Sequence, residues 1–263
     1  MTTPRASKTP APGAPAKRIE ISIRPGVTTP DWSVVTSETV REALEATFET
    51  CDWESRWAGL DDAQDRTRRA VLDAYALSGH APSITELAAA TGMVPENMRA
   101  VLGKLKARDM IVLEADDATI TGSYPFTERD TGHRIHLGDR VLNAMCAIDA
   151  LGAGAMYGRD VRIESACRFC GDAIRIETRD NGCVLKAFTP ESAVVWSGVA
   201  YADGCAATSL CTVMAFFCSD DHLHSWRTAE HSGGMGFRLS IEEGLQAGKA
   251  IFMPLLMPSP ANS

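Results

Sequence analysis

The chain has 263 residues, of which 45% are apolar and 23% charged, and its formal net charge is −8. These values exclude a wholly disordered or collagen-like chain, and the length predicts one or two domains. The eight cysteines stand out, being too few for a disulfide scaffold and more than a simple core requires. No apolar stretch approaches the ~20 residues that cross a bilayer, and the N-terminus lacks the apolar segment of a secretory signal. We therefore expect a cytoplasmic protein with no membrane partner, in which reduced cysteines serve metals or catalysis.

The sequence of the N-terminal half predicts a tail followed by helices. Residues 1–30 hold six of the 13 prolines and predict a disordered tail, because such a segment buries too little apolar surface to offset its ordering entropy. Val40, Leu44 and Phe48 recur every four residues and predict a helix. The elements expected in this half are helices over Thr36–Thr50, Asp65–Ser78 and Pro95–Ala107, a short helix opened by Ser83, and strands over Ile111–Leu113 and Ala118–Thr121.

Two helices joined by the turn Thr91-Gly92-Met93 and followed by two short strands are typical of a winged helix-turn-helix module. The residues that would contact DNA in it are Arg99, Lys104, Lys106 and Arg108. Three acidic residues in 83–113 reduce the net charge of this stretch to +1. Because affinity for phosphate backbones comes from clustered positive charge, we expect a packing module and no DNA partner.

The C-terminal half is richer in strands. Asp180-Asn181-Gly182 is a strong hairpin signal, and Ser240 and Glu243 have the spacing of a capping box that opens a helix toward Ala250. The other elements expected are a helix over Leu137–Met156 and strands over Val161–Glu164, Ala173–Glu177, Cys183–Phe188, Ala193–Trp196 and Thr212–Phe217.

Helices grouped first and strands later predict an α+β fold. We expect a disordered tail at 1–30, a helical, winged-helix-like module at 31–130, and a domain at 131–263 built on a mixed or antiparallel β-sheet with flanking helices.

Two cysteine motifs carry the candidate chemistry. Cys167-Arg168-Phe169-Cys170 is a CxxC between two predicted strands, and two thiolates make half of a tetrahedral zinc site. No second CxxC and no HxxxH follows, so unmetallated thiols are favoured over structural zinc at Cys167 and Cys170. In the second motif, Cys146 and Asp149 are three residues apart on the predicted helix, which places a thiol beside a carboxyl. Such a pair suits a site where sulfur binds a soft metal and oxygen moves a proton, although a core cysteine beside a surface aspartate has the same spacing.

Three segments, in order, resemble the organomercurial lyase (alkylmercury lyase) family. They are Asn143–Ala150 with its CxxD pattern, Gly158–Cys167 with the pattern G-R-x₅-S-x-C, and Cys211–Phe217, where a cysteine lies five residues before a Phe-Phe pair. The region of Trp226 and His231 and the final helix are also similar, so the resemblance covers roughly residues 65–255. It implies a winged-helix-like module that does not bind DNA, followed by a catalytic α+β domain.

The resemblance implies an enzyme that cleaves the carbon–mercury bond of R–Hg⁺ by protonolysis to R–H and Hg(II). Cys146 and Cys211 would be the thiolates that hold mercury, Asp149 would transfer the proton, and Cys167 would be structural. Thiolates select soft metals, so mercury is substrate and product and no cofactor is required. Small thiols or a mercuric reductase would accept the Hg(II).

The chain departs from the family pattern in its long tail, in the added cysteines Cys170 and Cys218, and at Met145 and Thr212. An alternative function therefore stays open at this point. It is a soft-metal-binding or metal-responsive winged-helix regulator that shares the fold without lyase activity.

Overall fold

The computed structural model describes residues 18–229 and 234–258. Its first element is a hairpin of β1 (Ile21–Arg24) and β2 (Val27–Thr29). Ile21 and Ile23 are completely buried, so the expectation of a disordered tail is wrong for residues 18–30, where alternating apolar side chains reach the core. Residues 1–17 lie outside the described part of the chain.

Local sequence signals place the helices that follow. Asp61 with Gln64 and Ser83 with Glu86 form capping boxes in which side chain and backbone N–H groups are satisfied reciprocally. Gly79 and Gly92 end the same two helices in the left-handed conformation. The elements are η1 (Trp32–Val34), α1 (Glu38–Cys51), α2 (Trp53–Trp57), α3 (Asp62–Ser78), α4 (Ile84–Thr91) and α5 (Pro95–Ala107). The predicted helices of this half are therefore confirmed, with α2 added.

An eight-stranded sheet forms the centre of the molecule, with strand order β10-β9-β8-β6-β7-β5-β4-β3. Every strand pairing recorded in the described residues is antiparallel. Its strands are β3 (Ile111–Leu113), β4 (Ile120–Ser123), β5 (Phe126–Thr127), β6 (Arg134–Leu137), β7 (Arg140–Ala144), β8 (Val161–Ala166), β9 (Ala173–Arg179) and β10 (Val184–Thr189). The two strands expected as a wing, β3 and β4, are the edge of this same sheet, and the winged-helix description and the division at residue 130 stay predictions.

The helix predicted over Leu137–Met156 is wrong in its first ten residues. Residues 137–144 belong to the β6–β7 hairpin, which turns at Gly138 with φ +60°, and Val141 is 52% exposed on β7. The helix, α6, covers only Ala147–Tyr157. An apolar run does not by itself distinguish a strand from a buried helix, and here the run contains both.

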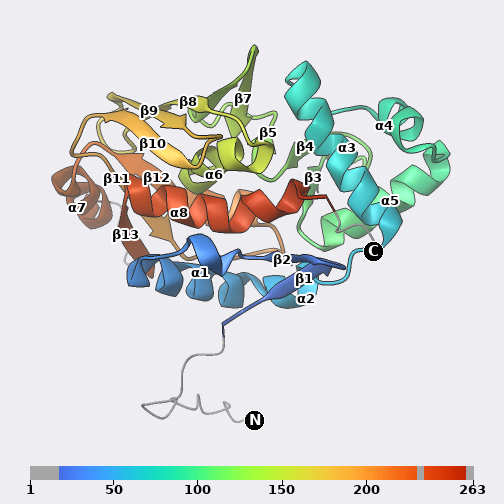
Figure 1. Cartoon of the computed structure of the whole chain (residues 1–263), viewed down its shortest axis with the longest axis horizontal. Coiled ribbons are helices and arrows are strands. Elements are labelled where there is room, and N and C mark those ends of the chain that lie inside the picture. Colours follow the sequence, from blue (N-terminus) through green and yellow to red (C-terminus); the bar gives the residue numbers. More distant parts are fainter. Residues whose placement is uncertain (1–17, 230–233, 259–263) are drawn as a thin grey trace, which may run out of the picture.

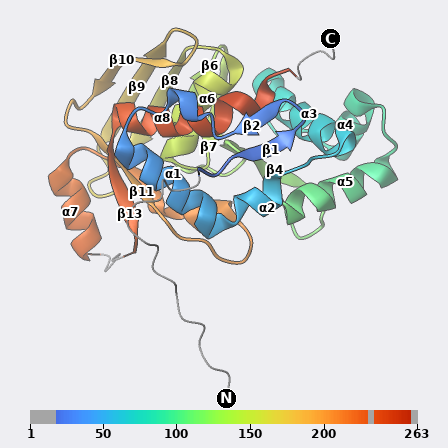
Figure 2. The ribbon, with the colours of Figure 1, turned by 60° about the horizontal axis from the view of Figure 1, so that its bottom comes forward.

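A smaller sheet and two more helices complete the fold. The sheet has the order β12-β11-β13, with β11 (Val194–Gly198), β12 (Met214–Phe217) and β13 (Gly236–Ser240), and it is accompanied by η2 (Ala206–Thr208), η3 (Leu210–Val213), α7 (Asp220–Ala229), α8 (Ile241–Phe252) and η4 (Met253–Leu256). The predicted capping box of Ser240 and Glu243 opens α8. Helices α3, α4 and α5 form one end of the molecule and α7 the other, while α8 runs between α1 and the large sheet (Figure 1, Figure 2). These findings confirm an α+β fold.

No helix in the ranges 18–229 and 234–258 is both long and apolar enough to cross a membrane.

Two glycines let α6 and α8 approach backbone to backbone. A Cβ built on Gly152 would lie 2.6 Å from the carbonyl oxygen of Gly248, and one built on Gly248 would lie 2.6 Å from the nitrogen of Gly152. Real Cβ atoms do not approach backbone this closely. The close packing fixes α6 on α8, and thereby sets where the N-terminus of α6 lies.

We predict that Gly248→Ala lowers the free energy of unfolding by about 1–3 kcal/mol, because an added methyl group in a close-packed interface forces the helices apart. Gly103→Ala is the matched control, since Gly103 is exposed on α5 with nothing within 4 Å of an added Cβ; it should be neutral or slightly stabilising. Urea denaturation of both variants checks this, and equal stabilities would contradict the assigned role of the glycine contact.

Candidate active site

Cys146 and Asp149 meet at the start of α6. Cys146 follows β7 and is the N-cap residue of the helix, with extended backbone, and Asp149 lies in the first helical turn. Both side chains are buried, at 2% and 3% exposure. The sequence correctly placed the thiol beside the carboxyl, although the helix begins at Ala147 rather than at Leu137.

The third residue of the site, Cys211, belongs to a distant part of the chain. Cys211 lies on η3, just before β12, and is 8% exposed. Its thiol donates to Asp149 Oδ2 at 3.6 Å, and the Cys146 thiol donates to Met214 Sδ at 3.7 Å. Ligand atoms of Cys146, Asp149 and Cys211 all lie within 4.8 Å of one another. The structure therefore brings together the three site residues that the sequence singled out.

A network around Asp109 holds the loop that carries Cys211. The Asp109 carboxylate accepts hydrogen bonds from the hydroxyl groups of Tyr124 (2.9 Å) and Tyr201 (3.0 Å) and from the backbone N–H of Ala206 (3.0 Å). The Tyr124 hydroxyl in turn accepts from the N–H of Ala207 at 2.8 Å. Asp109 is itself 2% exposed, and a buried, hydrogen-bonded carboxylate restricts the groups around it. Sequence reasoning missed this residue, which looks like an ordinary helix-end aspartate.

The three groups face a small apolar cavity of about 30 Å³. Its wall also comprises Ala43, Leu44, Thr47, Trp53, Trp57, Tyr124, Ile148, Ser197, Ala206, Leu210, Met214, Ala247, Ile251 and Phe252. One water requires roughly 10–15 Å³ of such space, so lining side chains must move before an organic group can enter. Residues of α1 and α2, which the sequence assigned outside the catalytic domain, thus form part of the site. Trp53 and Trp57 stack there with ring centroids 4.4 Å apart, whereas the sequence shows only two tryptophans four residues apart.

Burial and the short distances between the three groups shift their pKa values. Removal from water raises the pKa of the Asp149 carboxyl to about 7, although the two neighbouring thiols oppose the shift. Burial likewise raises the pKa of the Cys146 thiol, and the pKa of the Cys211 thiol is raised by its interaction with Cys146 and by burial. At neutral pH the site therefore holds two protonated thiols beside a carboxyl that exchanges its proton readily.

The other cysteines divide into two kinds. Cys167, Cys170 and Cys218 gather around His222 at a second position, with donor atoms within 4.8 Å of one another. Cys51 is buried, and Cys183 and Cys205 are partly exposed. Trp226 is buried on α7, whereas His231 lies outside the described residues.

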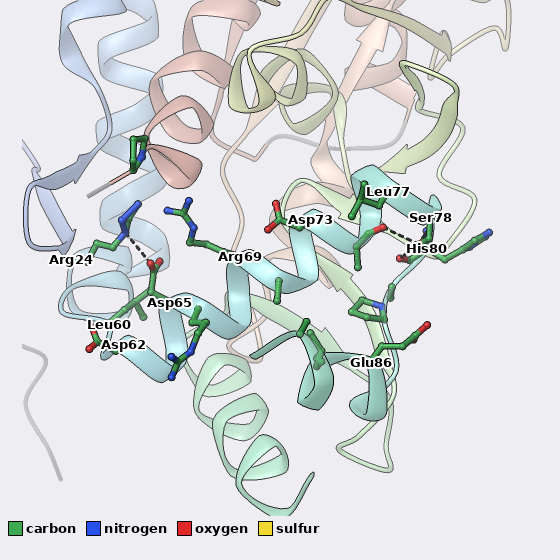
Figure 3. Close-up of a pocket in the computed structure, with 18 of the residues that line it drawn as sticks. Arg24, Leu60, Asp62, Asp65, Arg69, Asp73, Leu77, Ser78, His80 and Glu86 are labelled. Carbon is green, nitrogen blue, oxygen red and sulfur yellow. Dashed lines mark hydrogen bonds and ion pairs between the residues drawn. The ribbon is translucent and has the colours of Figure 1, made fainter. Parts of the chain in front are cut away.

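A much larger groove, of about 1640 Å³, shares no lining residue with the cavity and lies between the β1–β2 hairpin, α3 and α4 (Figure 3). Arg24 and Asp65 form an ion pair of 3.0 Å at one end of it. None of its lining residues is a cysteine, so the groove offers no soft ligand, and the small enclosed cavity is the candidate active site.

Comparisons with known proteins show similarity to alkylmercury lyases. Residues 126–253 match the family model described as alkylmercury lyase. An alkylmercury lyase of Bacillus cereus is 28% identical over 186 residues, which are 70% of this chain and 80% of the relative. One from Streptomyces lividans is 25% identical over 178 residues, 68% of this chain and 78% of the relative. A crystal structure described as the mercury-bound form of MerB2 matches with a TM-score of 0.65 at 26% identity, covering 83% of this chain and all of that one.

The matched segment contains Cys146, Asp149 and Cys211, and the structural match extends the similarity to most of the chain. Residues 126–253 of this chain match the alkylmercury lyase family.

Proposed function

We propose that the protein cleaves the carbon–mercury bond of R–Hg⁺ by protonolysis, with Cys146 and Cys211 as the mercury-binding thiolates and Asp149 as the proton-transfer residue. The observation that carries this assignment is the meeting of two thiols and one carboxyl within 4.8 Å in an apolar cavity. Thiolates are soft ligands that suit a soft metal. A carboxyl whose pKa lies near neutral pH is suited to general acid–base catalysis.

The reaction balances with these three groups alone. When the first thiol binds mercury, its proton passes to Asp149, and the second thiol loses its proton when it completes the bis-thiolate complex. The electron pair of the carbon–mercury bond goes to carbon, which takes a proton from Asp149 to form R–H. The net change is R–Hg⁺ plus two thiols to R–H, a bis-thiolate Hg(II) and one released proton.

The raised pKa values fit this order of events. Both thiols are protonated before substrate arrives, so the metal has to displace their protons, and a nearby base is needed to receive them. A carboxyl with a pKa of about 7 accepts a proton from a metal-bound thiol and later returns it without a large energy gap. A fully solvated aspartate, with a pKa near 3.9, would hold the proton too weakly to be an acid at neutral pH.

The product remains on two sulfurs, and we propose small thiols or a mercuric reductase as its acceptors, because exchange between thiolates is the direct route off the site. Since the reaction needs free thiols, a reducing compartment such as the cytoplasm is the proposed location.

The DNA-binding regulator is not favoured. Lys104 and Lys106 on α5 form ion pairs with Asp61 and Asp117. Arg108 donates to the carbonyl groups of Arg56 and Ala58, at 2.8 Å each. Three of the four basic side chains that would contact phosphates are thus engaged within the protein.

Phenylmercury in excess small thiol is the substrate we would use to test the reaction, with benzene release as the readout. Wild type should release benzene, and Cys146→Ser and Cys211→Ser should release it no faster than buffer does, because a hydroxyl is a poor ligand for mercury. Cys183→Ser is the control, since Cys183 lies away from the site, and should match wild type. Absence of benzene from wild type would reject the lyase assignment.

Asp149→Asn separates proton transfer from mercury binding. The amide keeps the shape of the carboxyl but carries no transferable proton at neutral pH, so we expect benzene release to slow by about 10²–10⁴-fold. Retention of Hg(II), measured by elemental analysis after gel filtration, should persist at one per chain. Undiminished turnover would mean that carbon receives its proton from another group.

The same substitution should alter how stability depends on pH. The pKa of Asp149 is about 7 in the folded protein and near 3.9 in the unfolded chain, so its stabilising contribution is complete below pH 4 and is lost as pH rises through 7. The amide that replaces the carboxyl does not titrate, and the stability of Asp149→Asn relative to wild type should therefore increase by about 1 kcal/mol between pH 6 and pH 8.

Urea denaturation at the two pH values measures this difference. The control is Asp139→Asn, in the exposed β6–β7 turn, whose stability relative to wild type should not change with pH. An equally flat result for Asp149→Asn would contradict the raised pKa.

A further inference from the structure

A second group of metal-ligand side chains lies apart from the cavity, where two chain segments meet. Cys167 and Cys170 lie in the connection between β8 and β9, Cys218 directly follows β12, and His222 is in the first turn of α7. One donor atom from each of the four lies within 4.8 Å of the others.

The separations between these donor atoms fit one tetrahedral ion. Zinc–sulfur bonds of about 2.3 Å and zinc–nitrogen bonds of about 2.0–2.1 Å place tetrahedral ligands roughly 3.5–3.8 Å from one another. Cys167 Sγ lies 3.5 Å from His222 Nδ1, and Cys170 Sγ lies 3.9 Å from Cys218 Sγ. Little movement is needed to close four bonds on a common centre.

Backbone N–H groups point at two of the three sulfurs. The N–H of Cys218 donates to Cys167 Sγ at 3.3 Å, and the N–H of Asp172 donates to Cys170 Sγ at 3.5 Å. Gly171, with φ +80°, supplies the left-handed residue that turns the chain immediately after the second cysteine. Hydrogen bonds to sulfur stabilise its charged form, which is the form that binds metal.

We propose that Cys167, Cys170, Cys218 and His222 bind one Zn²⁺ as a closed structural site. Cys-x₂-Cys is a typical spacing of zinc ligands, the pair Cys218 and His222 completes a Cys₃His ligand set, and four protein ligands leave no open position for a substrate. The mixed sulfur and nitrogen donors in a tetrahedral arrangement suit zinc.

This zinc site joins the large sheet to the strand that follows the active-site cysteine. Cys218 directly follows the last residue of β12, and the first residue of β12 follows η3, which carries Cys211. Two further contacts reinforce the same junction: the N–H of Arg168 donates to the Phe216 carbonyl at 3.0 Å, and its guanidinium donates to the Thr212 carbonyl at 3.3 Å. The zinc would therefore fix the position of Cys211 from outside the cavity, and the proposal does not depend on the reaction that Cys211 performs.

The test is the zinc content of the full chain, expressed with zinc and purified in the presence of a reductant without chelator. Elemental analysis should give one zinc per chain for wild type and for Cys183→Ser and Cys205→Ser, which alter cysteines outside the cluster. Cys218→Ser and His222→Ala should lose the zinc. His222→Cys, which restores a fourth ligand, should retain it and shows that loss in His222→Ala is not a failure to fold.

Replacing zinc with cobalt(II) tests the coordination geometry of the site. The zinc-free protein reconstituted with cobalt should show the strong visible bands of tetrahedral thiolate coordination, and these should be absent from Cys218→Ser. Three results would overturn the proposal: wild type that binds no zinc after reconstitution under reducing conditions, Cys218→Ser that retains as much zinc as wild type, or a Cys170–Cys218 disulfide in the freshly purified protein.

Discussion

A carboxyl group buried between two thiols is the constraint on which the rest of this structure depends. Asp149 is 3% exposed, and placing a carboxylate in such surroundings is unfavourable unless it is neutralised or hydrogen-bonded. The fold supplies one hydrogen bond from the Cys211 thiol and places Asp149 in the first turn of α6, where the helix dipole favours negative charge. The result is a group balanced between its two charge states near neutral pH, which is what a proton-transfer residue requires.

The pKa of Asp149 near neutrality depends on two distant chain segments that must keep fixed positions relative to each other. The N-terminus of α6 is positioned by the close approach of Gly152 and Gly248 on α8. The loop before Cys211 is held by Asp109, which collects hydrogen bonds from Tyr124, Tyr201 and Ala206. The reacting groups are thus supported by packing on one side and by a buried polar network on the other, and neither support contributes a reacting atom. The proposed zinc site would add a third support beyond β12.

Local signals in the sequence predict much of the helical structure, because a capping box or a terminal glycine acts over a few residues. Ser83, Ser240 and Gly79 each mark a helix end that the structure confirms. The alternating residues Ile21 and Ile23 were assigned to the disordered tail because of the prolines around them. The apolar run after Leu137 was assigned to a single helix because periodicity alone does not show where a strand ends and a buried helix begins.

Cys146, Asp149 and Cys211 could be singled out from the sequence because they carry a family pattern, and the structure places them together. What the sequence did not supply are contacts between residues far apart in the chain: Trp53 and Trp57 in the cavity wall, Asp109 beneath the loop, and His222 beside Cys167. Cys218 and His222 are separated by three residues in the sequence. Because this pair combines two different ligand types, it does not match the CxxC or HxxxH patterns.

The most direct test of this account is the location of mercury after one turnover, found by anomalous diffraction from crystals of the zinc-loaded protein treated with one equivalent of phenylmercury. We predict one mercury atom bonded to the sulfurs of Cys146 and Cys211, next to the Asp149 carboxyl and without a phenyl group. Mercury bound only at the cluster of Cys167, Cys170, Cys218 and His222, with Cys146 and Cys211 unmodified, would contradict it.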